Sequence, residues 1–97
     1  MDITVLELKE RLASGETFNF LDVRREDEYE DQNLGAKLIP LHELPDRVDE
    51  IEDWKDQEVV VMCRSGNRSG QAQRFLESEG FINVRNVIGG MLAWNEL

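Results

Sequence analysis

The sequence predicts an α/β fold in which a parallel sheet carries helices on both faces. Short apolar stretches alternate along the chain with segments whose apolar residues recur at helical spacing. The clearest strand is the apolar and mostly β-branched run at residues 59–62, which has the composition of a strand buried on both faces. A polar loop follows it, and Ala72, Phe75 and Leu76 then lie at the i, i+3 and i+4 positions of a helix. This strand–loop–helix order is the unit from which parallel sheets are built.

The first element is expected to be a helix that begins at residue 5. Thr4 and Glu7 have the spacing of a capping box, and Val5 and Leu8 share one helical face. Gly15 is a suitable stop for this helix. The elements expected after it are strands at residues 18–23, 37–39 and 84–87, helices at 25–31 and 44–51, and a short C-terminal stretch at 91–95.

Composition indicates one domain, residues 1–97, with room for one hydrophobic core. No stretch approaches the roughly 18 apolar residues of a membrane helix, and the N-terminus lacks the features of a secretion signal. The net charge of −10 argues against nucleic acid and anionic membranes as partners. A single cysteine allows no internal disulfide, so the expected location is the reducing cytoplasm. We expect a monomer that holds no metal and no other cofactor.

Many of the acidic residues are clustered in two groups, at residues 26–31 and 49–58. The favoured interpretation of such runs is solvated surface. The alternative is a docking face for a basic protein.

The candidate nucleophile is Cys63, the only cysteine, which begins the loop after the central strand. The next helix offers unpaired N–H groups and the positive end of its dipole, and Arg64 and Arg68 add two positive charges. Such surroundings lower a thiol pKa from about 8.5 toward neutrality and leave a nucleophilic thiolate. The alternative is an inert core cysteine, but two arginines and a helix start within seven residues favour a reactive loop. With no second cysteine in the chain, any group that Cys63 takes up must leave to another molecule.

Other candidate site residues come from the same loop and from a neighbouring strand end. Gly66 is expected to supply a backbone angle that other residues resist. Ser69 is either the cap of the following helix, which is the favoured interpretation, or a hydroxyl donor to the sulfur. Asp22 and Arg24 should share a rim with Cys63, because the carboxyl ends of parallel strands meet at one edge. A buried ion pair is the favoured interpretation of these two residues, and a catalytic role is the alternative.

Several motifs occur in a fixed order: Leu21-Asp22-Val23-Arg24, Ile39-Pro40-Leu41, Cys63-Arg64-Ser65-Gly66-Asn67-Arg68-Ser69, Gly80-Phe81 and Gly89-Gly90-Met91-Leu92-Ala93-Trp94. Together they resemble single-domain rhodaneses, a family of sulfurtransferases, over residues 3–95. The segments 33–36, 38–41 and 43–45 are together similar to a narrower group, the rhodanese domains attached to ubiquitin-activating-like adenylyltransferases. One departure is Gln32-Asn33, where many members of the family have a Gly-His pair.

The resemblance implies a three-layer fold with a five-stranded parallel sheet and a ping-pong reaction on Cys63. The thiolate would take sulfane sulfur from thiosulfate or a protein persulfide and pass it to a thiophilic acceptor. The implied partners are a small sulfur donor or acceptor, a sulfur-carrier protein or a cysteine desulfurase. Arg64 would bind an anionic donor, Arg68 would favour the anionic sulfur or fix the loop, and Asp22 and Arg24 would support the site. The anion cradle would consist of Arg64, Ser65, Gly66, Asn67, Arg68 and Ser69.

The sequence leaves two rival functions beside sulfur transfer. Cysteine phosphatases and arsenate reductases of this fold use Cys, five residues and then Arg, whereas Arg68 lies five positions after Cys63 and the sixth is Ser69. The shorter loop suits a sulfur atom better than a tetrahedral oxyanion. The second rival is a non-catalytic interaction module, against which the presence of the cysteine and both arginines argues.

Overall fold

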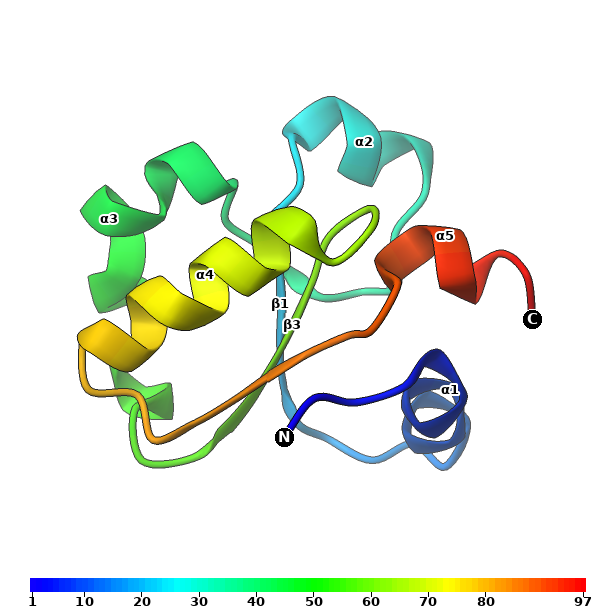
Figure 1. Ribbon diagram of the computed structural model, residues 1–97, viewed down its shortest axis with the longest axis horizontal. Helices are drawn as coiled ribbons and strands as arrows, with labels where there is room; N and C mark the ends of the chain where they lie inside the picture. Colours follow the sequence, from blue (N-terminus) through cyan, green and yellow to red (C-terminus); the bar gives the residue numbers. More distant parts are fainter.

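A parallel sheet lies between two layers of helices in the computed structural model, which describes all 97 residues (Figure 1). Its strands run in the order β2–β1–β3–β4, and every neighbouring pair is parallel. The strands are β1 (Asn19–Asp22), β2 (Lys37–Leu38), β3 (Glu58–Met62) and β4 (Asn83–Asn86). The predicted α/β class with a parallel sheet is confirmed.

The fifth strand that the resemblance implied is reduced to a single bridge. Ile3 pairs in parallel with Val87, just beyond β4, and its N–H donates to the carbonyl of Asn86 at 3.0 Å. The next residue, Thr4, already caps the first helix through a reciprocal bond with Glu7 at 3.1 Å. Because the chain turns into this helix after one paired residue, the sheet has four strands rather than five.

The helices follow the predicted order, with one break. They are α1 (Val5–Ala13), α2 (Glu26–Asp31), α3 (Leu44–Arg47), α4 (Asn67–Ser78) and α5 (Gly90–Trp94), with 3₁₀ segments at Leu41–Glu43 and Val48–Trp54. The helix expected at 44–51 is therefore wrong in its second half, which is a 3₁₀ segment kinked at Ile51. No helix of the structure combines the length and apolar character needed to cross a membrane.

The central strand β3 contributes to two separate cores because successive side chains point to opposite faces of a sheet. Val59 and Val61 pack into the core under α3 and α4, whereas Val60 and Met62 pack into the core under α1 and α5. Each buried valine stabilises the fold by about 1.5–3 kcal/mol. Cys63 continues the first set, so the sheet directs it toward α4.

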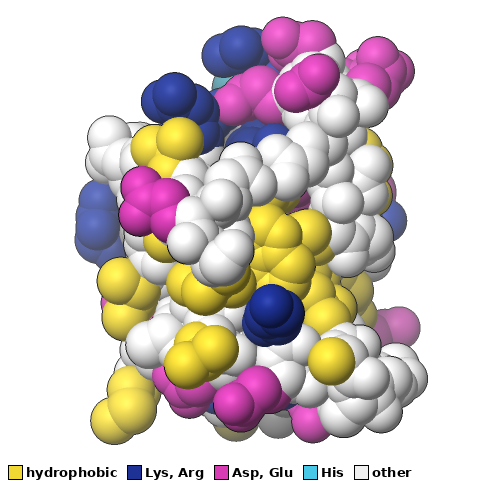
Figure 2. Space-filling model, turned by 90° about the vertical axis from the view of Figure 1, so that its right-hand side faces the viewer, with side chains coloured by type: hydrophobic (Ala, Val, Ile, Leu, Met, Phe, Trp, Pro, Cys, Tyr) yellow, Lys and Arg dark blue, Asp and Glu magenta, His cyan; other side chains and the backbone are white.

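The helix α2 lies beyond the carboxyl end of β1, at the top of Figure 1. None of its residues is fully buried, and acidic and basic side chains gather at this end of the molecule (Figure 2). Its acidic run is therefore mostly solvated, as the favoured interpretation held, with Glu28 as the half-buried exception.

Candidate active site

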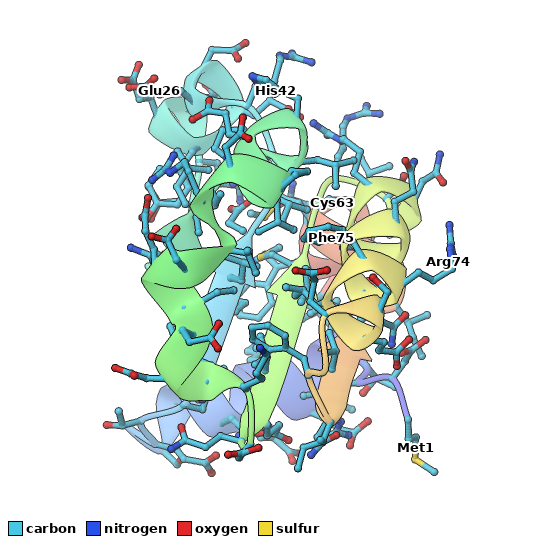
Figure 3. All side chains as sticks on the ribbon, turned by 90° about the vertical axis from the view of Figure 1, so that its left-hand side faces the viewer. Met1, Glu26, His42, Cys63, Arg74 and Phe75 are labelled. Carbon is cyan, nitrogen blue, oxygen red and sulfur yellow. The ribbon has the colours of Figure 1, made fainter.

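Cys63 follows the last residue of β3 and lies beside the first turn of α4 (Figure 3). It is buried, and its Sγ accepts a hydrogen bond from the backbone N–H of Gly66 at 3.0 Å. The Ser69 hydroxyl oxygen lies 3.2 Å from the same sulfur. A sulfur atom surrounded by hydrogen-bond donors is suited to carry negative charge.

The pKa of Cys63 lies below its ordinary value. Burial of the thiol raises this pKa and is the largest single influence, but hydrogen bonds together outweigh it. The lowering contributions come first from the Ser69 hydroxyl and then from the backbone N–H groups of Ser69, Gly66 and Ser65. Hydrogen bonds, rather than the arginine charges emphasised by the sequence, are thus the main stabilisers of the thiolate.

The loop after Cys63 turns sharply into α4 at Gly66, which has φ of +99°. Residues with a side chain rarely adopt this left-handed backbone conformation. The prediction that Gly66 supplies a backbone angle that other residues resist is therefore confirmed. The helix begins at Asn67, with Gly66 at the N-cap position. Ser69 is consequently the third helical residue, and its interpretation as the cap is wrong. Its buried hydroxyl faces the sulfur instead.

Arg68 is the second residue of α4, and its side chain reaches a carboxylate on α2. Its guanidinium donates to both carboxylate oxygens of Glu28 on α2, at 2.6 and 2.9 Å. The pair fixes the first turn of α4 against α2 and offsets most of the charge that Arg68 would present to Cys63. Because this guanidinium is committed to a carboxylate, it does not close a cradle around an oxyanion.

Arg64 is the free cation of the site. Its side chain is exposed and makes no hydrogen bond or ion pair, whereas its neighbour in the chain, Cys63, is buried. Arg64 borders a pocket of about 220 Å³ between α2 and α5, together with residues that include Asp31 and Leu92. A second pocket, of about 240 Å³, lies beside Arg68. Cys63 lines neither pocket.

Asp22 and Arg24 form a buried ion pair at the end of β1. The Arg24 Nη2 donates to Asp22 Oδ2 at 2.8 Å, and both side chains are almost inaccessible to solvent. The same guanidinium donates to the carbonyls of Glu28 and Gln32, at 3.3 and 2.6 Å. The pair therefore holds α2 over the end of the sheet, and each buried charge has its partners.

Comparison with known proteins identifies the family. The model of the rhodanese-like domain matches residues 4–97, nearly the whole chain. The chain belongs to the rhodanese family. By homology it is therefore a rhodanese-type sulfurtransferase.

Three relatives illustrate the breadth of this match. A sulfurtransferase of Allochromatium vinosum is 40% identical over 88 residues, which cover 90% of this chain and 80% of the relative. The putative sulfur carrier protein YrkF of Bacillus subtilis is 37% identical over 96% of this chain, but the chain spans only 50% of YrkF. The crystal structure of a rhodanese-like domain protein from Staphylococcus aureus has a TM-score of 0.85 and 35% identity, with 97% of this chain and 91% of that chain covered.

The narrower resemblance is also confirmed. The adenylyltransferase and sulfurtransferase MOCS3-2 of Zea mays is 32% identical over 97% of this chain. The match covers only 21% of that protein, so it concerns one part of a longer chain.

Sequence reasoning missed how α5 supports the rhodanese loop. The N–H groups of Met91 and Leu92 donate to the carbonyls of Cys63 and Arg64, both at 2.9 Å. Gly90 permits this approach, because a Cβ there would overlap the carbonyl of Cys63 and lie 2.7 Å from that of Arg64. The first turn of α5 thus clamps the junction between β3 and the loop. The Gly89-Gly90 pair was visible in the sequence, but nothing there indicated which backbone it approaches.

Sequence reasoning also missed Asn86, the last residue of β4. Its side-chain amide donates to the carbonyl of Gly66 at 3.0 Å, and its Oδ1 lies 2.5 Å from the Ser69 hydroxyl oxygen. The available signal was its position, because a polar residue that ends a parallel strand shares the rim with Cys63.

Proposed function

We propose that Cys63 carries sulfane sulfur as a persulfide from a donor to a thiophilic acceptor. The observation that supports this most strongly is the set of donors around its sulfur, the Gly66 N–H at 3.0 Å and the Ser69 hydroxyl at 3.2 Å. These groups favour an anionic sulfur in the resting thiolate and again in the persulfide. A compact loop with no free guanidinium closing it favours sulfur over a phosphate group.

The reaction has two displacement steps. The Cys63 thiolate attacks the outer sulfur of thiosulfate, a new S–S bond forms, and sulfite leaves with the electron pair of the broken S–S bond. An acceptor thiolate then attacks the outer sulfur of the persulfide, and the Cys63 thiolate is regenerated. Arg64, exposed and unpaired, binds the anionic end of the donor.

Access to the sulfur requires a local opening of the site. Cys63 is buried and lines neither neighbouring pocket, so a donor reaches the sulfur only when the groups that cover it move. The pocket beside Arg64 is the proposed approach, because it presents a free cation next to the loop.

The proposed partners are a small donor such as thiosulfate, a protein persulfide or cysteine desulfurase, and a thiol or a sulfur-carrier protein as acceptor. The name of YrkF, a putative sulfur carrier protein, supports a carrier-linked role. A reducing compartment such as the cytoplasm suits the single free cysteine.

The test is steady-state sulfur transfer from thiosulfate to a thiol acceptor. The wild-type protein should turn over, and Cys63→Ser should lose all activity while it keeps the same thermal unfolding midpoint. Undiminished transfer by a folded Cys63→Ser protein would exclude the proposal. Hydrolysis of p-nitrophenyl phosphate that disappears in Cys63→Ser would instead support the phosphatase alternative.

A further inference from the structure

One hydroxyl group in the site faces two acceptors. The Ser69 Oγ lies 3.2 Å from the Sγ of Cys63 and 2.5 Å from the Oδ1 of Asn86. A serine hydroxyl has a single proton and can donate to only one of them at a time. The Cys63 sulfur and the Asn86 Oδ1 therefore compete for the Ser69 hydroxyl proton.

The orientation of the Asn86 amide decides where the Ser69 proton lies while Cys63 is a thiol. Its Nδ2 donates to the Gly66 carbonyl at 3.0 Å, and a flipped amide would place two oxygens against each other there. The Oδ1 that faces Ser69 carries no proton, so the Ser69 proton must bridge the 2.5 Å contact. The lone pairs of Ser69 are then free to accept from the Cys63 thiol.

Backbone hydrogen bonds hold Asn86, the residue that supplies the acceptor Oδ1, in place. Asn86 ends β4, its backbone N–H donates to the Asp2 carboxylate at 3.1 Å, and its carbonyl accepts from the Ile3 N–H at 3.0 Å. The Gly66 carbonyl also accepts from the Gly70 N–H at 3.0 Å, so it keeps a partner even without the Asn86 side chain. Loss of that side chain thus leaves no buried carbonyl unpaired.

We propose that Asn86 is a positioning residue that acts on the Cys63 sulfur through the Ser69 hydroxyl. While Cys63 is a thiol, Asn86 holds the hydroxyl proton. When the thiol loses its proton to solvent, the Ser69 hydroxyl rotates about its C–O bond and donates to the anionic sulfur. The role of this exchange in catalysis rests on the proposed sulfur transfer, but the competition for the proton acts on the thiol alone.

The charged groups of the elements around the site lie on the loop, α4, α2, the end of β1 and the N-terminal segment. They are Arg64, Arg68, Glu28, Asp22, Arg24 and Asp2. Variants that retain all six of these residues can be compared directly, because the electrostatic contribution of the six to the pKa of Cys63 stays constant.

The test is a double-mutant cycle of Ser69→Ala and Asn86→Ala, read as the pKa of Cys63 from the pH dependence of its alkylation by iodoacetamide. Ser69→Ala should raise this pKa. Asn86→Ala should lower it by about 0.5 to 1 pKa unit, the size that one neutral hydrogen bond supports. In the Ser69→Ala background, Asn86→Ala should change nothing. Equal shifts in both backgrounds would mean that Asn86 acts on the loop structure, and no shift in either would remove it from the site.

A second variant keeps the inference testable if Asn86→Ala unfolds. Asn86→Asp has almost the same shape, but its carboxylate retains the hydroxyl proton more strongly and adds a negative charge. It should raise the pKa of Cys63, and by less when Ser69 is alanine. An unchanged or lowered pKa would overturn the inference. Neither measurement needs a sulfur donor, so a wild-type protein that takes up no sulfur from thiosulfate would contradict the proposed function separately.

Discussion

The Arg68 guanidinium donates two hydrogen bonds to the carboxylate of Glu28, at 2.6 and 2.9 Å, although the two residues are 40 positions apart in the sequence. The Arg68 side chain is 27% exposed and the Glu28 side chain 14% exposed, and the pair joins the first turn of α4 to α2. This ion pair therefore anchors the start of α4, which follows the Cys63 loop, and the Glu28 carboxylate offsets the positive charge of Arg68.

The first prediction concerns this pair in acid. The Arg68 hydrogen bonds lower the pKa of Glu28 from 4.5 to about 2 in the folded protein. A lowered carboxylate pKa stabilises the fold above pH 4.5, and this contribution is lost as the pH falls toward 2. The stability advantage of the wild type over Glu28→Gln should shrink across this window by roughly 1–2 kcal/mol, allowing for solvent screening.

Urea unfolding at a series of pH values measures this difference. Glu26→Gln removes an exposed carboxylate without a partner from the same helix and is the matched control. A Glu28→Gln protein whose stability runs parallel to the wild type down to acid pH would show that the ion pair contributes nothing.

The two arginines should differ in their effect on catalysis. Arg64→Ala removes an unpaired, exposed cation, so it should raise KM for thiosulfate and lower kcat/KM roughly 10- to 100-fold, the loss of one charge-assisted hydrogen bond. With a neutral polysulfide donor it should change little. Arg68→Ala breaks the anchor to α2 and should lower the rate with both donors. Steady-state kinetics with each donor decides this, and identical profiles for the two variants would contradict the division of roles.

The α5 clamp predicts a large effect at one glycine. Gly90→Ala places a Cβ against the carbonyls of Cys63 and Arg64, at a residue with φ of +55°. It should destabilise the protein by roughly 2 kcal/mol or more and reduce sulfur transfer. Gly35→Ala, at φ of +85° with no atom within 4 Å of the new Cβ, carries the backbone strain alone and is the control. Equal losses of stability and activity in the two variants would argue against the clamp.

The thiol of Cys63 should ionise below the ordinary range. Burial raises the pKa of this thiol, but the hydrogen bonds from the Ser69 hydroxyl and the loop N–H groups together lower it by more than burial raises it. The alkylation rate should therefore increase with pH to a midpoint below about 8.5, the value for an unperturbed cysteine. A midpoint at or above this value would contradict the proposed stabilisation of the thiolate.

The sequence was sufficient for the order of elements, because each carries a local signal. The capping box of Thr4 and Glu7, the β-branched run of β3 and the helical spacing after it all depend on near neighbours. The loop around Cys63 was equally visible, since its residues are contiguous. The error in strand number has a local cause as well, because the cap at Thr4 ends the pairing of Ile3.

The contacts within the site were harder to predict because they join distant segments. Nothing local indicates that Arg68 pairs with Glu28 and not with the sulfur, or that α5 reaches the carbonyl of Cys63. Ser69 was assigned to the cap because serine favours that position, but the left-handed Gly66 starts the helix earlier. The contacts of Asn86 with Gly66 and Ser69 depend on the pairing of β4 with β3, which local sequence patterns do not reveal.

The most direct test of sulfur transfer is the intact mass of the protein after incubation with thiosulfate and removal of excess donor. The wild type should gain one sulfur atom, lose it again on addition of a thiol acceptor, and show no gain when Cys63 is replaced by serine. A wild-type protein that stays at its original mass, or a Cys63→Ser protein that gains the same sulfur, would contradict a persulfide on Cys63.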